Sequence, residues 1–181
     1  LMANVDSDKD SRSDWEKTYR EGLEQLGMKY EERTQPFEGA SGVMHPLLAE
    51  SVTQFQAQAY NELLPSQGPV KTQVLGMTTA ESEQQASRVQ EFMNYQLMQV
   101  MKEYDSETDQ MLFYLPLSGS AFRKVYYDQN LDRAVSKFIP SEDLIVPYSA
   151  TDLHSATRIT HVIDMSINDI KKLQQVGFYR D

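Results

Sequence analysis

Three acidic side chains at alternate positions, Asp105, Glu107 and Asp109, carry the spacing of a calcium-binding loop. An EF-hand loop also requires a glycine one position after the third acidic ligand and a glutamate at its end. Position 110 is instead glutamine, and apolar residues follow it. The pattern therefore favours the charged start of a helix over a calcium site, and we assign no metal ligand.

The residue types that serve as catalytic groups lack recognisable partners. His45, His154 and His161 are far apart, and none lies in an HExxH or comparable metal-binding pattern. Gly39-Ala-Ser-Gly42 resembles part of a phosphate-binding loop, but no Lys-Ser or Lys-Thr pair follows it. The chain has no cysteine and no Gly-x-Ser-x-Gly elbow. The sequence predicts no catalytic, cofactor-binding or metal site, and a protein that is not an enzyme.

Composition narrows the possible partners. The 181 residues carry a formal net charge of −10, and the acidic excess lies before residue 120. Without a basic stripe to displace phosphate counterions, tight binding of DNA or RNA is not expected. The longest apolar run, residues 111–117, is far below the roughly 18 residues of a membrane-spanning helix. We therefore expect a soluble protein without a membrane contact.

The candidate residues must be positioned by a single α+β region, predicted for residues 13–181. Its helical part covers residues 13–118 and its β-rich part residues 119–181. Residues 1–12 are polar and acidic, which predicts a disordered leader. Helices first and strands later favour an antiparallel sheet over alternating βαβ units.

Two helices are predicted early in the helical part. Ser13-x-x-Glu16 is a capping-box pattern that begins a helix of about 13 residues, which Gly27 ends. Pro46 suits the first turn of a second helix, and Pro65 prevents it from continuing. Both stretches have apolar residues at helical spacing between these limits.

The rest of the helical part is more mixed. Residues 28–42 contain charges, proline and glycine, which predicts an extended loop. Residues 70–75 form a short run that could pair as a strand. A capping box beginning at Thr78 predicts a long helix through Tyr104, and a short helix is expected over residues 108–115.

The β-rich part begins with a hairpin. Residues 122–127 and 133–139 are β-rich runs that flank a polar loop. Residues 144–146 and 158–163 are two further strand candidates, and a helix over residues 166–175 closes the region. The predicted fold is α+β, with N-terminal helices followed by a small antiparallel sheet with a hairpin and a closing helix.

Two helical surfaces are candidates for a subunit interface. The second helix has a glutamine-rich face that includes Gln54 and Gln58. This face lies opposite the apolar stripe of the helix. The long helix is apolar on more than one side, where Met98 and Met101 are surplus to a single core-facing stripe. Such a surface is typical of a helix that a second subunit or a further domain covers.

Most of the sequence resembles one protein family. The segments PFEGASGVMHPLLAESVTQFQAQAYNELLPSQGPVKTQVLG, RVQEFMNYQL, DQMLFYLPLSGSAFRKVYYDQNLDRAVSKFIPSEDLIVPYSATDL and RITHVIDMSINDIKKLQQVGFYRD resemble the N-terminal half of portal proteins of podovirus-type tailed bacteriophages. The resemblance extends more weakly into WEKTYREGLEQLGMKYEERTQPF. It implies the wing region of a head-tail connector, truncated from a longer protein.

The resemblance also implies a function and partners. A portal is a homo-oligomeric ring, usually of twelve subunits, at the capsid vertex through which DNA is packaged and ejected. Its partners are the terminase, scaffold or capsid proteins and tail adaptors, and DNA passes through the channel without tight binding. We therefore expect a structural protein of the virion that assembles in the host cytoplasm and needs no cofactor.

Two other functions remain open from the residues alone. A metal-assisted nuclease or other hydrolase would have to use the scattered carboxylates, such as Asp164, together with His161, although no motif supports it. Another head-tail adaptor or virion protein with a similar sheet is the second alternative.

Overall fold

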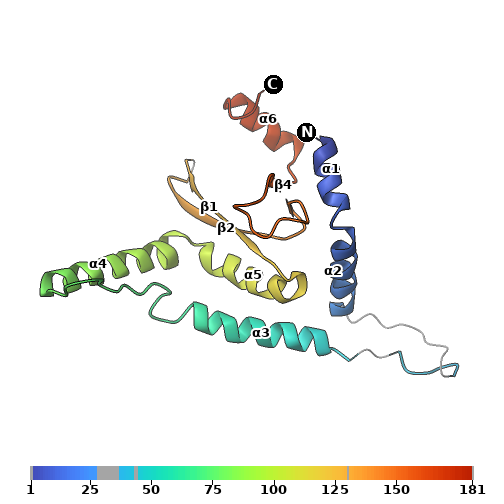
Figure 1. Ribbon diagram of the computed structural model, residues 1–181, viewed down its shortest axis with the longest axis horizontal. Helices are drawn as coiled ribbons and strands as arrows, with labels where there is room; N and C mark the ends of the chain where they lie inside the picture. Colours follow the sequence, from blue (N-terminus) through green and yellow to red (C-terminus); the bar gives the residue numbers. More distant parts are fainter. Residues whose placement is uncertain (1, 28–36, 43–44, 130, 181) are drawn as a thin grey trace. The chain divides into compact units, whose positions relative to one another are not determined.

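The computed structural model describes residues 2–27, 37–42, 45–129 and 131–180. They form two compact units, and Figure 1 labels most of their elements. The central unit is Asp14–Ser141, and the terminal unit combines Leu1–Ser13 with Glu142–Asp181. Each unit is therefore described by itself.

The central unit contains most of the helices and a β-hairpin. Its elements in chain order are α2 (Ser13–Leu26), α3 (Leu47–Leu63), α4 (Ala80–Tyr95), a π-helical turn (Gln96–Val100), α5 (Tyr104–Ser118), β1 (Phe122–Asp128) and β2 (Arg133–Ile139).

Helix α5 is the centre of this unit, because α3 packs along it and the hairpin packs against it. The strands β1 and β2 are antiparallel, with Phe122 opposite Ile139 and Asp128 opposite Arg133. The most buried apolar side chains come from all three layers: Val52 of α3, Leu112 of α5, and Val135 and Ile139 of β2.

Polar contacts fix the register of α3 against α5. The Gln56 amide donates to the Asp109 carboxylate at 2.6 Å, and one helical turn further on the Tyr60 hydroxyl donates to Asp105. Helix α2 joins the unit through Trp15, whose indole N–H donates to the carbonyl oxygen of Ser118 at 2.9 Å. The Trp15 ring also stacks on that of Tyr19.

The terminal unit is built from the two ends of the chain. Its elements are α1 (Met2–Asp10), β3 (Leu144–Ile145), β4 (Thr160–His161) and α6 (Ile167–Gln175). The two strands are antiparallel, with Leu144 opposite His161. Helix α6 begins at an N-cap, Ser166, whose hydroxyl oxygen accepts the Asp169 N–H.

The expectation of a disordered leader at residues 1–12 is wrong for the part that is described. Met2–Asp10 form helix α1, and Asp8 is buried. Its carboxylate accepts two hydrogen bonds from the Arg158 guanidinium, at 2.7 and 3.0 Å. Distant partners thus order a segment whose local composition is typical of disorder.

The α+β fold class is confirmed, but its organisation differs from the expected division at residue 118. The hairpin belongs with the helices of the central unit, and the unit boundary follows Ser141. In the described part of the chain, the sheet is two separate two-stranded sheets, β1–β2 and β3–β4. The predicted helices at the start of the central unit and at α6 are confirmed, as is the hairpin. Most of the loop predicted over residues 28–42 lies outside the described residues.

The boundaries of two helices also differ from the prediction. The long helix is capped one residue later than expected, by a reciprocal pair of hydrogen bonds between Thr79 and Ser82, and it is interrupted after the π-helical turn, before Tyr104. Helix α5 extends past the predicted stop at Pro116 as far as Ser118. Proline is tolerated there because only the last turn loses a hydrogen bond, and Gly119 then ends the helix in a left-handed conformation.

No helix among the described residues is both long enough and apolar enough to cross a membrane.

Arg12 fixes α1 to the first strand of the terminal unit. Its guanidinium donates to the carbonyl oxygens of Glu142 at 2.6 Å and Leu144 at 3.1 Å. Two carbonyls of alternate residues point to the same edge of a strand, so one planar guanidinium can bind both.

We predict that Arg12→Ala lowers the unfolding free energy of the terminal unit by about 2–4 kcal/mol, because two charge-assisted hydrogen bonds are lost. Circular dichroism would report a lower midpoint in urea. Trp15, the single tryptophan, lies in the central unit. The urea midpoint measured by its fluorescence should therefore be unchanged. Lys9→Ala, at an exposed position of α1, is the control. Equal stability of Arg12→Ala and wild type would contradict the assignment.

Candidate subunit interface

The segment before α4 is held along that helix by side chains, not by a neighbouring strand. We call residues 67–75 the pinned segment. The Asn94 amide oxygen accepts the Val70 N–H at 2.9 Å, and its amide nitrogen donates to the Val70 carbonyl at 3.1 Å. Gln90 accepts the Thr72 N–H at 3.1 Å. The strand predicted over residues 70–75 is therefore wrong: these residues form no strand, and their backbone binds side chains of α4.

Matching repeats make this pairing possible. Gln90 and Asn94 are one turn apart on α4, a rise of about 6 Å, and alternate residues of an extended chain are about 6.6–6.8 Å apart. Two amides at this spacing can thus bind Thr72 and Val70 in succession. The next turn of the helix presents Ala86, which has no polar side chain, and its carbonyl accepts the Thr72 hydroxyl at 3.0 Å.

The hydrogen-bonded row stops at this point, and an open groove of ≈ 400 Å³ follows between the pinned segment and the first half of α4. It is lined by Thr72, Gln73, Val74, Thr78, Glu83, Ala86, Ser87 and Gln90.

Gly68 allows the pinned segment to approach α4. Its φ of 92° is in the left-handed region that favours glycine. A Cβ at this position would lie 2.4 Å from Cγ of Asn94. Any side chain here would therefore displace the amide that holds Val70.

Beside the pinned segment, α4 exposes large apolar side chains. Phe92 is 62% exposed, and Val89 and Met93 lie on the same face and are also exposed. None of the residues of α4 is buried. At the end of the pinned segment, Leu75 is 87% exposed, and Met77 just beyond it is 91% exposed. Apolar side chains gathered on one element in this way are typical of an interaction surface.

The hairpin has an edge that is bound by the same device. Glu103 and Glu107, one turn apart at the start of α5, accept the backbone N–H groups of Ser136 and Phe138 at 3.4 and 2.7 Å. Both N–H groups lie on the side of β2 that faces away from β1, because alternate residues point to opposite edges. Arg133 forms an ion pair with Glu103 at 2.8 Å.

The Arg133 guanidinium, which donates to the Glu103 carboxylate, holds the pKa of Glu103 below its ordinary value, and the Ser136 N–H adds to this effect. The carboxylate is therefore charged in the folded chain, as an acceptor for two donors requires.

The four residues predicted for a subunit interface lie in two parts of the central unit. Gln54 and Gln58 are exposed on α3. Met98 is exposed in the π-helical turn, and Met101 directly follows that turn and is half-buried. Their role in subunit contacts stays a prediction. Sequence reasoning missed the exposed face of α4, because Val89, Phe92 and Met93 have the spacing of a core-facing stripe.

The acidic trio of α5 has structural partners. Asp105 and Asp109 bind α3, and Glu107 binds β2. Across the described residues, no three histidine, aspartate or glutamate side chains gather as a potential metal site. The structure therefore gives this trio a role in positioning α3 and β2 on α5.

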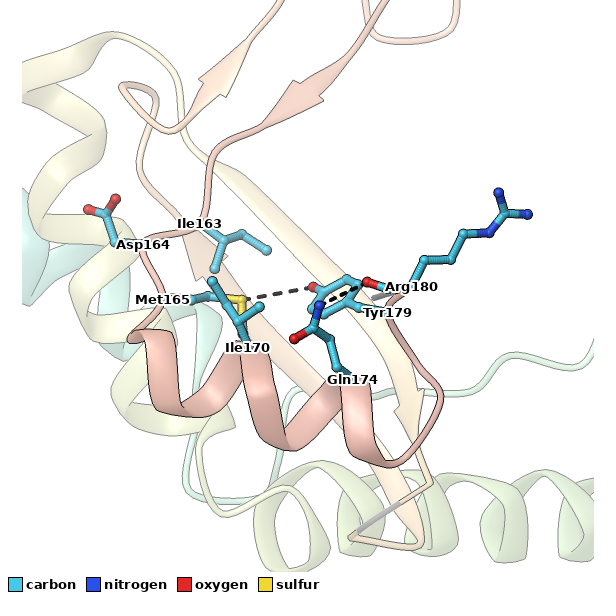
Figure 2. Close-up of a pocket in the computed structure, with 7 residues that line it drawn as sticks. All are labelled: Ile163, Asp164, Met165, Ile170, Gln174, Tyr179 and Arg180. Atoms are coloured by element: carbon cyan, nitrogen blue, oxygen red, sulfur yellow. Dashed lines mark hydrogen bonds between the residues drawn. The ribbon is translucent and has the colours of Figure 1, made fainter.

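A second hollow lies in the terminal unit beside α6 (Figure 2). It is open and has a volume of ≈ 660 Å³. The Tyr179 hydroxyl donates to the Met165 sulfur across it, at 3.8 Å. Figure 2 shows the Asp164 carboxylate and the Arg180 guanidinium directed away from the hollow. The groups that remain facing it are mainly an amide, a phenol and apolar side chains.

We predict that Asn94→Ala releases the pinned segment. The variant loses three hydrogen bonds to the backbone of the segment, two at Val70 and a longer one at the Gln67 carbonyl. At about 1 kcal/mol for each of the two at Val70, the open population should increase about tenfold or more. Trypsin cleavage after Lys71, in the middle of the segment, measures this population directly. Gly68→Ala should act in the same direction, whereas Gln85→Ala, at an exposed position of α4, should not. Unchanged cleavage of Asn94→Ala would show that the amide does not hold the segment.

The depressed pKa of Glu103 predicts a pH dependence of stability. A carboxyl whose pKa is lower in the folded state stabilises it above the unfolded-state pKa, and this contribution is lost as the pH falls through the folded-state pKa. At pH 7, Glu103→Gln should lower the unfolding free energy by about 1 kcal/mol. The difference from wild type should shrink below pH 4.5, the ordinary value.

Urea unfolding followed by Trp15 fluorescence between pH 7 and pH 3 would measure this difference. Glu62→Gln, at an exposed position of α3, is the matched control. A difference for Glu103→Gln that is the same at all pH values would contradict the assigned ion pair.

Comparison with known proteins adds no family to this description. No model of a known protein family matches the chain, and no curated protein matches it.

Proposed function

We propose that this chain is a ring-building subunit of a bacteriophage portal, the structure at the capsid vertex through which DNA is packaged and ejected. The observation that supports the proposal most directly is the exposed apolar face of α4 beside the pinned segment. A structural role of this kind requires no catalytic group.

The exposed face of α4 suits a contact between subunits for two reasons. Burial of large apolar side chains between subunits stabilises the complex by roughly 25 cal/mol per Å² of apolar surface removed from water. They are also held on a helix and on a segment that side-chain hydrogen bonds fix to it, so few conformations are lost on association. Methionine and aromatic residues, which are frequent at interfaces, supply much of this surface.

The charge of the chain suits a portal that DNA passes through. A net charge of −10 disfavours tight binding to phosphates, so a channel of such subunits would guide DNA without holding it. The partners of the ring would be the terminase, the scaffold or capsid proteins and a tail adaptor. The protein would accordingly be located in the virion, after assembly in the host cytoplasm.

We predict that substitution of the α4 face prevents assembly. Phe92→Ser combined with Met93→Ser removes apolar surface that is exposed in the single chain, so the fold should be retained while association weakens at least tenfold. Mass photometry, together with negative-stain electron microscopy for rings, would measure assembly. Val176→Ser, an exposed apolar position of the terminal unit, is the control.

Rings of wild type and of the control, with smaller species for the double variant, are the expected result. A wild-type protein that is monomeric at every concentration would contradict the proposed function. Rings that form equally well in the double variant would contradict the role of α4.

A further inference from the structure

The outer edge of β1 differs from the outer edge of β2, because no side chain binds its backbone groups in the described part of the chain. The N–H groups of Ser136 and Phe138 bind the glutamates of α5, so these residues do not bond across to β1. Their opposite residues are Val125 and Arg123. In an antiparallel pair, such residues turn their own N–H and C=O groups to the outer edge.

Because alternate residues of a strand direct their backbone groups to the same edge, Tyr127 also lies on this outer edge. In the described part of the chain β1 pairs with β2 alone, so Arg123, Val125 and Tyr127 present three unpaired pairs of backbone groups. Val125 is 64% exposed and Tyr127 is 60% exposed. A strand of seven residues with an open edge and exposed apolar side chains is a template for pairing with another strand.

The pinned segment has an open edge of the same length. Val70 and Thr72 use their backbone groups on α4. The alternate residues Lys71, Gln73 and Leu75 therefore direct theirs to the opposite side, where no hydrogen bond is found within the described residues. This edge also ends in exposed apolar side chains.

We infer that the outer edge of β1 in one copy pairs with the outer edge of the pinned segment in a neighbouring copy. The inference rests on the proposed ring, which it deepens by naming the strands that join its subunits. Each edge offers three outward residues at the same spacing, so the two can bond along their whole length.

A second copy of the chain is the occupant for a geometric reason. The two open edges belong to the same unit and differ from each other, so each copy can offer one edge to each of two neighbours. Contacts of this head-to-tail kind form a ring when the rotation between neighbours closes, whereas an edge that pairs with itself gives only a dimer. Leu75 of one copy and Val125 or Tyr127 of the next would be covered in the same step.

Cysteine crosslinking tests the inference, because the chain has no cysteine of its own. The protein with both Gln73→Cys and Val125→Cys carries a thiol at the middle residue of each open edge. Outward residues directly opposite each other have Cα atoms about 5.5 Å apart, which is within the range of a disulfide. Oxidation of the assembled protein should give a ladder of covalent oligomers on a non-reducing gel.

Mass spectrometry of the digested ladder should identify a peptide that joins positions 73 and 125. Gln85→Cys with Val125→Cys is the control, since position 85 is exposed on α4 but lies outside the pinned segment. The control should give no ladder beyond the level of single-cysteine variants.

Other outcomes would overturn the inference. Efficient dimers of Val125→Cys alone would indicate that β1 pairs with β1 across a two-fold axis. A disulfide within one chain would show that the two edges belong to the same copy. Rings of the double-cysteine protein without crosslinks would remove the strand pairing and leave the proposed function standing, whereas a wild-type protein that never assembles would overturn both.

Discussion

Backbone groups along the open edge of a strand must find partners, and this chain satisfies many of them with side chains from helices. Four residues of a helix rise by about 6 Å, and two residues of a strand span about 6.6–6.8 Å. Side chains one turn apart can therefore bind alternate residues of a strand. Gln90 and Asn94 do so for the pinned segment, and Glu103 and Glu107 do so for β2.

The same requirement explains why the sheets are small and where surfaces stay open. Each capped edge has its backbone groups already bonded. No further strand can therefore pair with the outer edge of β2 or with the α4 side of the pinned segment. In the terminal unit, Arg12 binds the carbonyls of Glu142 and Leu144 on one edge of the chain entering β3. The carbonyl between them, that of Asp143, accepts the Val162 N–H from the β4 side. The outer edge of β1 and the far side of the pinned segment are left without caps, next to exposed apolar side chains.

Local sequence signals predicted several helices and the hairpin, whereas helix α1 depends on partners that are distant in the sequence. The hairpin, α3 and α6 follow from β-rich runs, proline limits and the Ser166 cap. Helix α1 could not be predicted, because Asp8 and Arg12 gain their partners from residues 130 to 150 positions away. The exposure of the apolar face of α4 could not be predicted, because its spacing is that of a buried stripe. The interface positions Gln54, Gln58, Met98 and Met101 stay predictions, since exposure alone does not identify a partner.

Residue-resolved amide hydrogen exchange of the unassembled chain reports which backbone N–H groups are bonded, and therefore whether helix side chains cap these edges. Slow exchange is expected at Val70, Thr72, Ser136 and Phe138, whose acceptors are side chains of α4 and α5. Fast exchange is expected at the alternate residues Lys71, Gln73, Arg123 and Val125. Equal exchange of the two sets, in either the fast or the slow range, would show that side chains of α4 and α5 do not cap one edge of each strand.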